Sequence, residues 1–92
     1  MSKRVLVIED EPTLALLLQE RLEKEGYSAT TCGDGEEGLT QALRGGFDLL
    51  VLDIKLPGRN GFEVCRELRR HCINLPVLML TARGDVKDRV RD

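Results

Sequence analysis

The feature that most constrains the fold is an alternation of short apolar runs with longer segments of helical periodicity. Continuous apolar runs occupy residues 4–8, 47–53 and 76–80, and a weaker run occupies residues 27–32. Runs of this length fit strands, and runs that are apolar at successive positions are typical of strands buried on both faces. We therefore expect four strands, with the second of them nearer an edge of the sheet.

The segments between these runs predict helices with recognisable start and stop signals. Pro12 opens the first helix and Gly26 stops it, as expected for proline in a first turn and glycine after a last one. A second helix is expected from the Gly33-Asp34-Gly35 turn to Gly45-Gly46, a third from about Gly61 to His71, and a fourth from Asp85 onward. The apolar positions expected to face the core are Leu14, Leu17, Leu18 and Leu22 in the first helix, Leu39, Ala42 and Leu43 in the second, Phe62, Cys65 and Leu68 in the third, and Val86 and Val90 in the fourth.

The order β-α-β-α-β-α-β-α predicts an α/β fold with a parallel sheet and helices on both faces. In such sheets, ligands bind outside the carboxyl ends of the strands. The residues at those ends are Glu9 and Asp10, Asp53, and Thr81. The sequence therefore brings three acids and a hydroxyl to one rim of the sheet.

Composition limits the classes of function. A chain of 92 residues forms one domain at most, and its net charge of −2 with a pI near 5.4 argues against a nucleic-acid-binding surface. The three cysteines form no C-x-x-C pair, which favours a reducing compartment. No segment is long or apolar enough for a signal peptide or a membrane span. We expect a cytoplasmic protein.

Converging carboxylates can be explained in two ways. Without a partner they repel one another and raise one another's pKa, and a small hard cation such as Mg²⁺ relieves this repulsion. A carboxylate beside such a metal can also act as a nucleophile and form an acyl phosphate. Alternatively, acids at strand ends can cap nearby helices. The spacing of the residues alone leaves both explanations open.

Two enzyme or cofactor classes are less compatible with the residues. Dehalogenase-like phosphatases need a second aspartate two residues after the first, and Lys55 occupies that position. Residues 33–38, Gly-Asp-Gly-Glu-Glu-Gly, match a dinucleotide-binding G-x-G-x-x-G. Its three acids would repel a pyrophosphate, so a turn followed by a helix start explains this segment better.

Three motifs together resemble the receiver domain of bacterial two-component response regulators, and the likeness runs from Val5 to Asp92. VLVIEDE is similar to the acidic pocket of that family, LLVLDIKLPGRNG to its phosphoacceptor strand and loop, and LPVLMLTAR to its fourth strand. The stretch MLTARGD-x-x-DRV looks most like the subfamily that carries a C-terminal winged-helix DNA-binding domain. The resemblance implies a flavodoxin-like receiver fold, with residues 1–92 covering its first four β-α units.

The resemblance also implies a mechanism. Asp53 would receive a phosphoryl group from a sensor histidine kinase, and Mg²⁺ would be held by Asp10, Asp53 and the backbone carbonyl of Lys55, with Glu9 acting through water. Thr81 would be the switch hydroxyl, and Thr81 and backbone N–H groups near Ile54 and Ala82 would bind the phosphoryl oxygens. The expected role is a phosphoacceptor switch, not an enzyme, that signals to a transcription-regulating output domain absent from this chain.

Two basic residues, Lys55 and Arg83, occupy the positions that tune phosphate loss in that family. They would either shield the phosphoryl group or simply point to solvent, and the sequence allows both.

The family pattern continues with a fifth strand, its lysine and a fifth helix, none of which follows Asp92 here. We therefore expect a receiver fragment in which residues 77–80 become an exposed edge and the leucine face of the first helix partly faces water. Such a chain would self-associate or need a partner that completes the fold. The alternative function is a non-phosphorylated interaction module or an engineered scaffold fragment.

Overall fold

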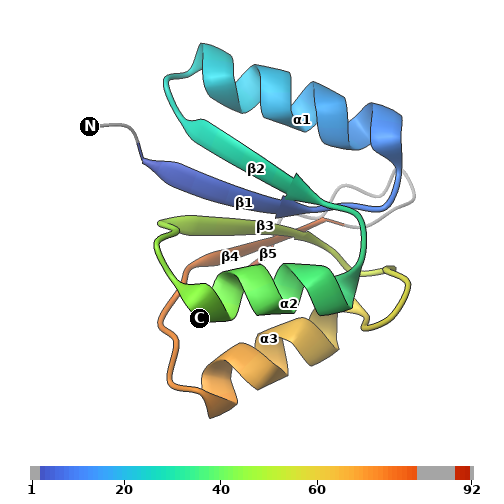
Figure 1. The fold of residues 1–92 in the computed structure, drawn as a ribbon, viewed down its shortest axis with the longest axis vertical. Helices are drawn as coiled ribbons and strands as arrows, with labels where there is room; N and C mark the ends of the chain where they lie inside the picture. The colour runs from blue at the N-terminus through green and yellow to red at the C-terminus, as the bar shows by residue number, and fades with distance from the viewer. Residues whose placement is uncertain (1–2, 81–88, 92) are drawn as a thin grey trace.

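The computed structural model describes residues 3–80 and 89–91, which form one mixed sheet with helices on both faces (Figure 1). The strand order is β2-β1-β3-β4-β5, and all neighbouring strands are parallel except β4 and β5. The strands are β1 (Arg4–Ile8), β2 (Ser28–Cys32), β3 (Leu49–Asp53), β4 (Val77–Leu80) and β5 (Arg89–Arg91), and the helices are α1 (Pro12–Lys24), α2 (Gly35–Arg44) and α3 (Gly61–Arg70). The predicted α/β class and the order of the first four strands and three helices are confirmed.

The core has two unequal layers because successive side chains of a strand point to opposite faces of the sheet. The larger layer lies under α2 and α3, where Leu6, Ile8, Leu50 and Leu52 are fully buried. The smaller layer lies under α1 and consists of Val5, Val7 and Val51, with partly buried leucines around them. Figure 1 shows this arrangement, with α1 on one face and α2 and α3 together on the other.

Each described helix begins at a polar side chain that caps its first turn. Glu11 accepts a hydrogen bond from the Thr13 N–H before Pro12 begins α1, and Asp34 accepts one from the Glu37 N–H at the start of α2. At α3, Asn60 and Glu63 form a reciprocal capping box. The first turns are therefore fixed by local sequence.

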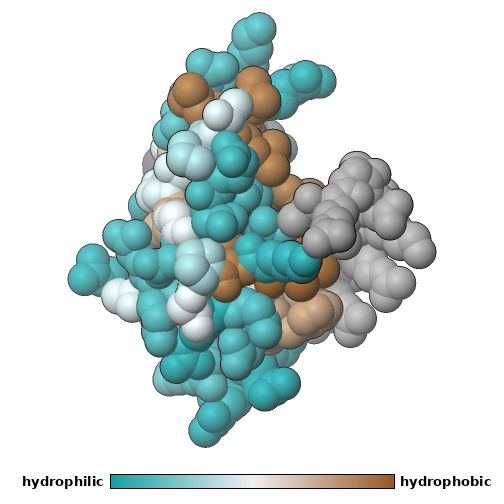
Figure 2. Space-filling view, turned by 90° about the vertical axis from the view of Figure 1, so that its right-hand side faces the viewer, coloured by the Kyte–Doolittle hydropathy of each residue, from teal (hydrophilic) through white to brown (hydrophobic). Residues whose placement is uncertain are grey.

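Two apolar stripes differ from the expected ones. In α1, Leu18 and Leu22 pack on the smaller core layer, but Leu17 is 57% exposed and Leu14 is 37% exposed. Figure 2 shows this apolar surface in brown at the top of the molecule, where α1 lies. In α3, Phe62 is 47% exposed and Val64 is buried instead. The expectation that part of the α1 leucine face meets water is confirmed, whereas the inward position of Phe62 is wrong.

The end of the chain also differs from the expectation. Residues 89–91 were expected to continue a fourth helix, with Val90 facing the core, but they form β5, which pairs antiparallel with β4. The start of that helix, with Val86, lies outside the described residues. The expectation that residues 77–80 form an unpaired edge is wrong, because β5 supplies the hydrogen-bonding partner that the edge lacks.

Candidate metal centre

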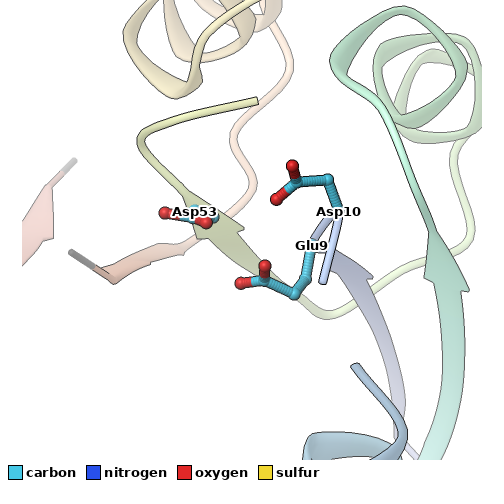
Figure 3. Close-up of side chains that lie close together, drawn as sticks. All are labelled: Glu9, Asp10 and Asp53. Atoms are coloured by element: carbon cyan, nitrogen blue, oxygen red, sulfur yellow. The ribbon is translucent and has the colours of Figure 1, made fainter. Parts of the chain in front are cut away.

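Three carboxylates meet at the carboxyl end of the sheet. Glu9 and Asp10 directly follow β1, and Asp53 is the last residue of β3, the strand next to β1. Because β1 and β3 are parallel, their ends deliver these side chains to the same rim (Figure 3). One carboxylate oxygen from each residue lies within 4.8 Å of the other two. The juxtaposition that the sequence predicts is therefore present.

The three acids differ in their exposure and hydrogen bonding. Glu9 is 4% exposed and Asp53 is 3% exposed, whereas Asp10 faces solvent. Glu9 Oε2 accepts a hydrogen bond from the Glu11 N–H at 3.0 Å, and Asp53 Oδ1 accepts one from the Lys55 N–H at 3.3 Å. Among the residues that the structure describes, Glu9 Oε1 is buried and has no hydrogen-bond partner. A buried carboxylate oxygen without a hydrogen bond destabilises the folded state unless a ligand binds it.

The electrostatics of the cluster favour a positive charge. The pKa of Glu9 is raised to about 7, mainly by burial and also by the negative charge of Asp53, although the hydrogen bond from the Glu11 backbone partly opposes these two effects. A cation among the three acids would stabilise their ionised forms. Oxygen ligands from carboxylates are those that Mg²⁺ prefers, so the orphaned Glu9 oxygen and the donor set fit this ion.

The alternative role of these acids as helix caps has no support in the described residues. The side chains that cap α1, α2 and α3 are those of Glu11, Asp34 and Asn60. The three acids of the cluster are therefore not used to begin any helix of the described chain.

The two backbone N–H groups that follow Asp53 have different hydrogen-bond partners. The Ile54 N–H donates to the Leu80 carbonyl at 3.1 Å, so it belongs to the sheet and is not free to bind a phosphoryl oxygen. The Lys55 N–H faces Asp53 instead. Along a strand, every second N–H points to the same neighbouring strand. The Leu50 N–H also points to the β4 side of β3, where it donates to the Pro76 carbonyl.

The remaining predicted residues divide into two groups. Lys55 is exposed in the loop that follows Asp53, and an open pocket of about 520 Å³ lies beside it. The residues that line this pocket are Asp10, Ile54, Lys55, Leu56, Pro57, Asn60 and Phe62. Thr81, Ala82 and Arg83 lie outside the described residues.

Comparison with known proteins gives a consistent result. The profile of the response regulator receiver domain matches residues 5–92. The transcriptional regulatory protein TcrA of Mycobacterium tuberculosis is 49% identical over 87 residues, which cover 95% of this chain and 34% of TcrA. The alkaline phosphatase synthesis transcriptional regulatory protein PhoP of Bacillus subtilis is 46% identical over 90 residues, which cover 98% of this chain and 38% of PhoP.

A solved structure of a similar protein carries ligands. The response regulator TrrA of Thermotoga maritima, in complex with Mg²⁺-BeF, superposes with a TM-score of 0.83 at 43% identity and covers 89% of this chain and 71% of that one. TrrA is also known in complex with the histidine kinase ThkA, where the TM-score is 0.80 at 40% identity, with 92% and 75% of the two chains covered.

The chain belongs to the response regulator receiver domain family. It is thus a receiver of two-component signal transduction, the class of domain that accepts a phosphoryl group in this signalling. The chain spans between 34% and 39% of the length of the curated relatives it matches. Within residues 3–80 and 89–91, no helix has both the length and the apolar character needed to cross a membrane.

Proposed function

We propose that Asp53 is the phosphoacceptor of this receiver. The observation that carries the proposal is a carboxylate with 3% exposure at the end of β3, whose oxygen lies within 4.8 Å of carboxylate oxygens from two further acids. In the proposed step, an Asp53 carboxylate oxygen forms a bond to phosphorus as the P–N bond of a kinase phosphohistidine breaks, and the electron pair stays on the imidazole nitrogen.

Mg²⁺ is the proposed cofactor. Asp10, Asp53 and the Lys55 carbonyl would hold it, with Glu9 acting through water, and the ion would supply positive charge for the transferring phosphoryl group. The support is the orphaned Glu9 oxygen and the convergence of three carboxylates. The Lys55 N–H, which already points at Asp53, would donate to a phosphoryl oxygen.

The downstream part of the proposal concerns residues and partners that the structure does not describe. Thr81 would act as the switch hydroxyl and Ala82 would donate its backbone N–H to the phosphoryl group. The partners would be a sensor histidine kinase and, in a longer protein, a DNA-binding output domain, as the regulators named above suggest. Residues 1–92 would act in the cytoplasm as a switch that is phosphorylated and reset, without turnover of a substrate of its own.

The experiment uses acetyl phosphate with Mg²⁺ as the phosphodonor and intact mass spectrometry as the readout. We expect the chain to gain one phosphoryl group, the Asp53→Asn variant to gain none, and the matched control Asp48→Asn to behave as the parent. Asp48 lies just before β3, at the other end of that strand, and its carboxylate accepts from the Arg4 N–H, which an asparagine oxygen can still do.

Equal labelling of Asp53→Asn would show that another residue is the nucleophile. Absence of label on the parent chain would overturn the proposal and favour the alternative function, a receiver fold used as a non-phosphorylated interaction module.

A further inference from the structure

The glycine-rich segment at the start of α2 has no role in the proposed chemistry, yet it contacts the loop that carries Lys55. The Gly35 N–H donates to the Pro57 carbonyl at 3.0 Å. A Cβ at position 35 would overlap the backbone carbonyl of Arg59. Only glycine therefore allows α2 and this loop to approach so closely.

A charged contact reinforces the approach. The Arg59 guanidinium lies 3.1 Å from Glu36 Oε1, and Glu36 also packs beside Gly58, whose φ of +82° forms the tight turn of the loop. The ion pair is partly exposed and adds little stability by itself. Its position matters more, because it holds the loop against the first turn of α2.

The other end of the loop is held by Gly61. Its N–H donates to the Ile54 carbonyl at 2.8 Å, and a Cβ there would lie 2.7 Å from the Asp53 carbonyl oxygen. The loop is thus attached at its far end to the sheet and in its middle to α2. Lys55, whose N–H faces Asp53, lies between Ile54 and Pro57, the two residues whose carbonyls accept these hydrogen bonds.

The same helix also contacts β1, the strand that precedes the acid pair. A Cβ at Gly38 would overlap the side chain of Ile8, the residue before Glu9. One turn of α2 therefore packs against the strand that bears the acid pair and against the loop that follows Asp53.

We propose that Gly35 and Glu36 are positioning residues that fix the Lys55 backbone relative to Asp53 and the acid pair. The proposal rests on the proposed function, because the Lys55 N–H and carbonyl matter for Mg²⁺ and phosphoryl binding. It assigns the G-x-G-x-x-G segment to the geometry of the phosphoacceptor loop instead of to a nucleotide.

The test compares Gly35→Ala with Gly33→Ala in the same chain. Gly33 is the matched control because a Cβ there would meet no atom of the described residues within 4 Å. Mg²⁺ is titrated while the backbone amide resonance of Lys55 is followed by NMR, and the rate of labelling by acetyl phosphate is measured. We expect Gly35→Ala to shift the Lys55 resonance and to weaken Mg²⁺ binding by about tenfold, the range typical of residues that orient metal ligands. Gly33→Ala should match the parent in both.

A second pair of variants protects the test against a failure of Gly35→Ala to fold. Glu36→Arg removes the ion pair at an exposed site, and the double variant Glu36→Arg with Arg59→Glu restores it with the charges exchanged. We expect the single variant to weaken Mg²⁺ binding by about twofold, in line with a partly exposed pair. The double variant should recover part of the loss, because Glu63 and Glu67 repel a negative charge at position 59.

The outcomes separate this proposal from the proposed function. Folded Gly35→Ala with parental Mg²⁺ affinity and an unmoved Lys55 resonance would overturn the positioning role, as would Glu36→Arg with no effect on either readout. Failure of acetyl phosphate to label the parent chain would overturn the phosphoacceptor assignment alone, since the Mg²⁺ titration does not depend on phosphorylation.

Discussion

At the end of β1, Glu9 is held among acids with 4% of its surface exposed, and burial raises its pKa to about 7. An ordinary glutamate, like Glu9 in the unfolded chain, has a pKa of 4.5. The folded chain therefore binds the Glu9 proton more tightly than the unfolded chain does. Between these two pKa values the unfolded state binds fewer protons, so the free energy of unfolding falls as the pH rises.

We expect the contribution of Glu9 to this pH dependence to disappear in Glu9→Gln. With Mg²⁺ removed by EDTA, the parent should lose stability as the pH rises from 5 to 8 by on the order of 2 kcal/mol, because one pKa unit corresponds to about 1.4 kcal/mol. Glu9→Gln should lose less, and it should exceed the parent in stability at pH 8. Urea unfolding at both pH values measures this, with Glu20→Gln, an exposed change in α1, as the control. Parallel pH profiles of Glu9→Gln and the parent would contradict the assignment.

The residues of the site could be predicted to different degrees. Glu9, Asp10 and Asp53 follow from strand ends alone, because parallel strands bring their carboxyl ends to one rim. The predicted backbone N–H groups near Ile54 are distinguished only in the structure, where the Ile54 N–H donates to β4 and the Lys55 N–H donates to Asp53. The contact of Gly35 with Arg59 could not be predicted, because it depends on how a loop folds against a distant helix.

At the scale of elements, local sequence signals were sufficient to predict helix boundaries wherever they agreed with tertiary packing. Pro12 and the glycine turns bound the first two helices as expected, and α3 begins at Gly61 as predicted. Helical spacing correctly placed Leu68 and Cys65 toward the core in α3, but it misplaced Phe62, which is exposed while Val64 is buried. Spacing fixes which residues share a face, whereas the neighbouring elements decide which face is buried.

The largest error at this scale is the segment 89–91, whose apolar spacing suggested a helix. Pairing with β4 is a long-range interaction that periodicity does not report, and it prevails over a weak helical pattern. β5 is three residues long and contains two arginines, and short charged strands protect the edge of a sheet. Strand exchange through β4 is therefore not expected in the intact chain.

Deletion of residues 89–92 tests this role of β5. Removing the segment leaves one side of β4 without hydrogen-bonding partners, and an apolar unpaired edge recruits strands from other molecules. We expect the shortened chain to self-associate with rising concentration and the intact chain to sediment as a monomer under the same conditions. Sedimentation velocity distinguishes the two, and identical behaviour of both chains would show that β5 does not protect the edge.

At the scale of the whole molecule, the acidic cluster links parts of the chain that are far apart in sequence. Glu9 and Asp10 come from the first strand and Asp53 from the third, so the three carboxylates converge only in the folded chain. Mg²⁺ should accordingly bind the folded state and not the unfolded one, and any such ligand stabilises the folded state. The ion would also relieve the repulsion among the acids, and a divalent cation would relieve it more than a monovalent one.

We expect the free energy of unfolding to rise with the logarithm of Mg²⁺ concentration, by about 1.4 kcal/mol for each tenfold increase above the dissociation constant. Removal of the ion by EDTA should reverse the gain. Asp10→Asn and Asp53→Asn should each reduce the gain, because each removes a proposed ligand, whereas Asp48→Asn should retain it. Urea unfolding in MgCl₂ and in NaCl of equal ionic strength separates binding from screening, since screening depends on ionic strength alone. Equal stabilisation by the two salts would show that the acidic cluster does not bind Mg²⁺, and the proposed role of the metal would then fail.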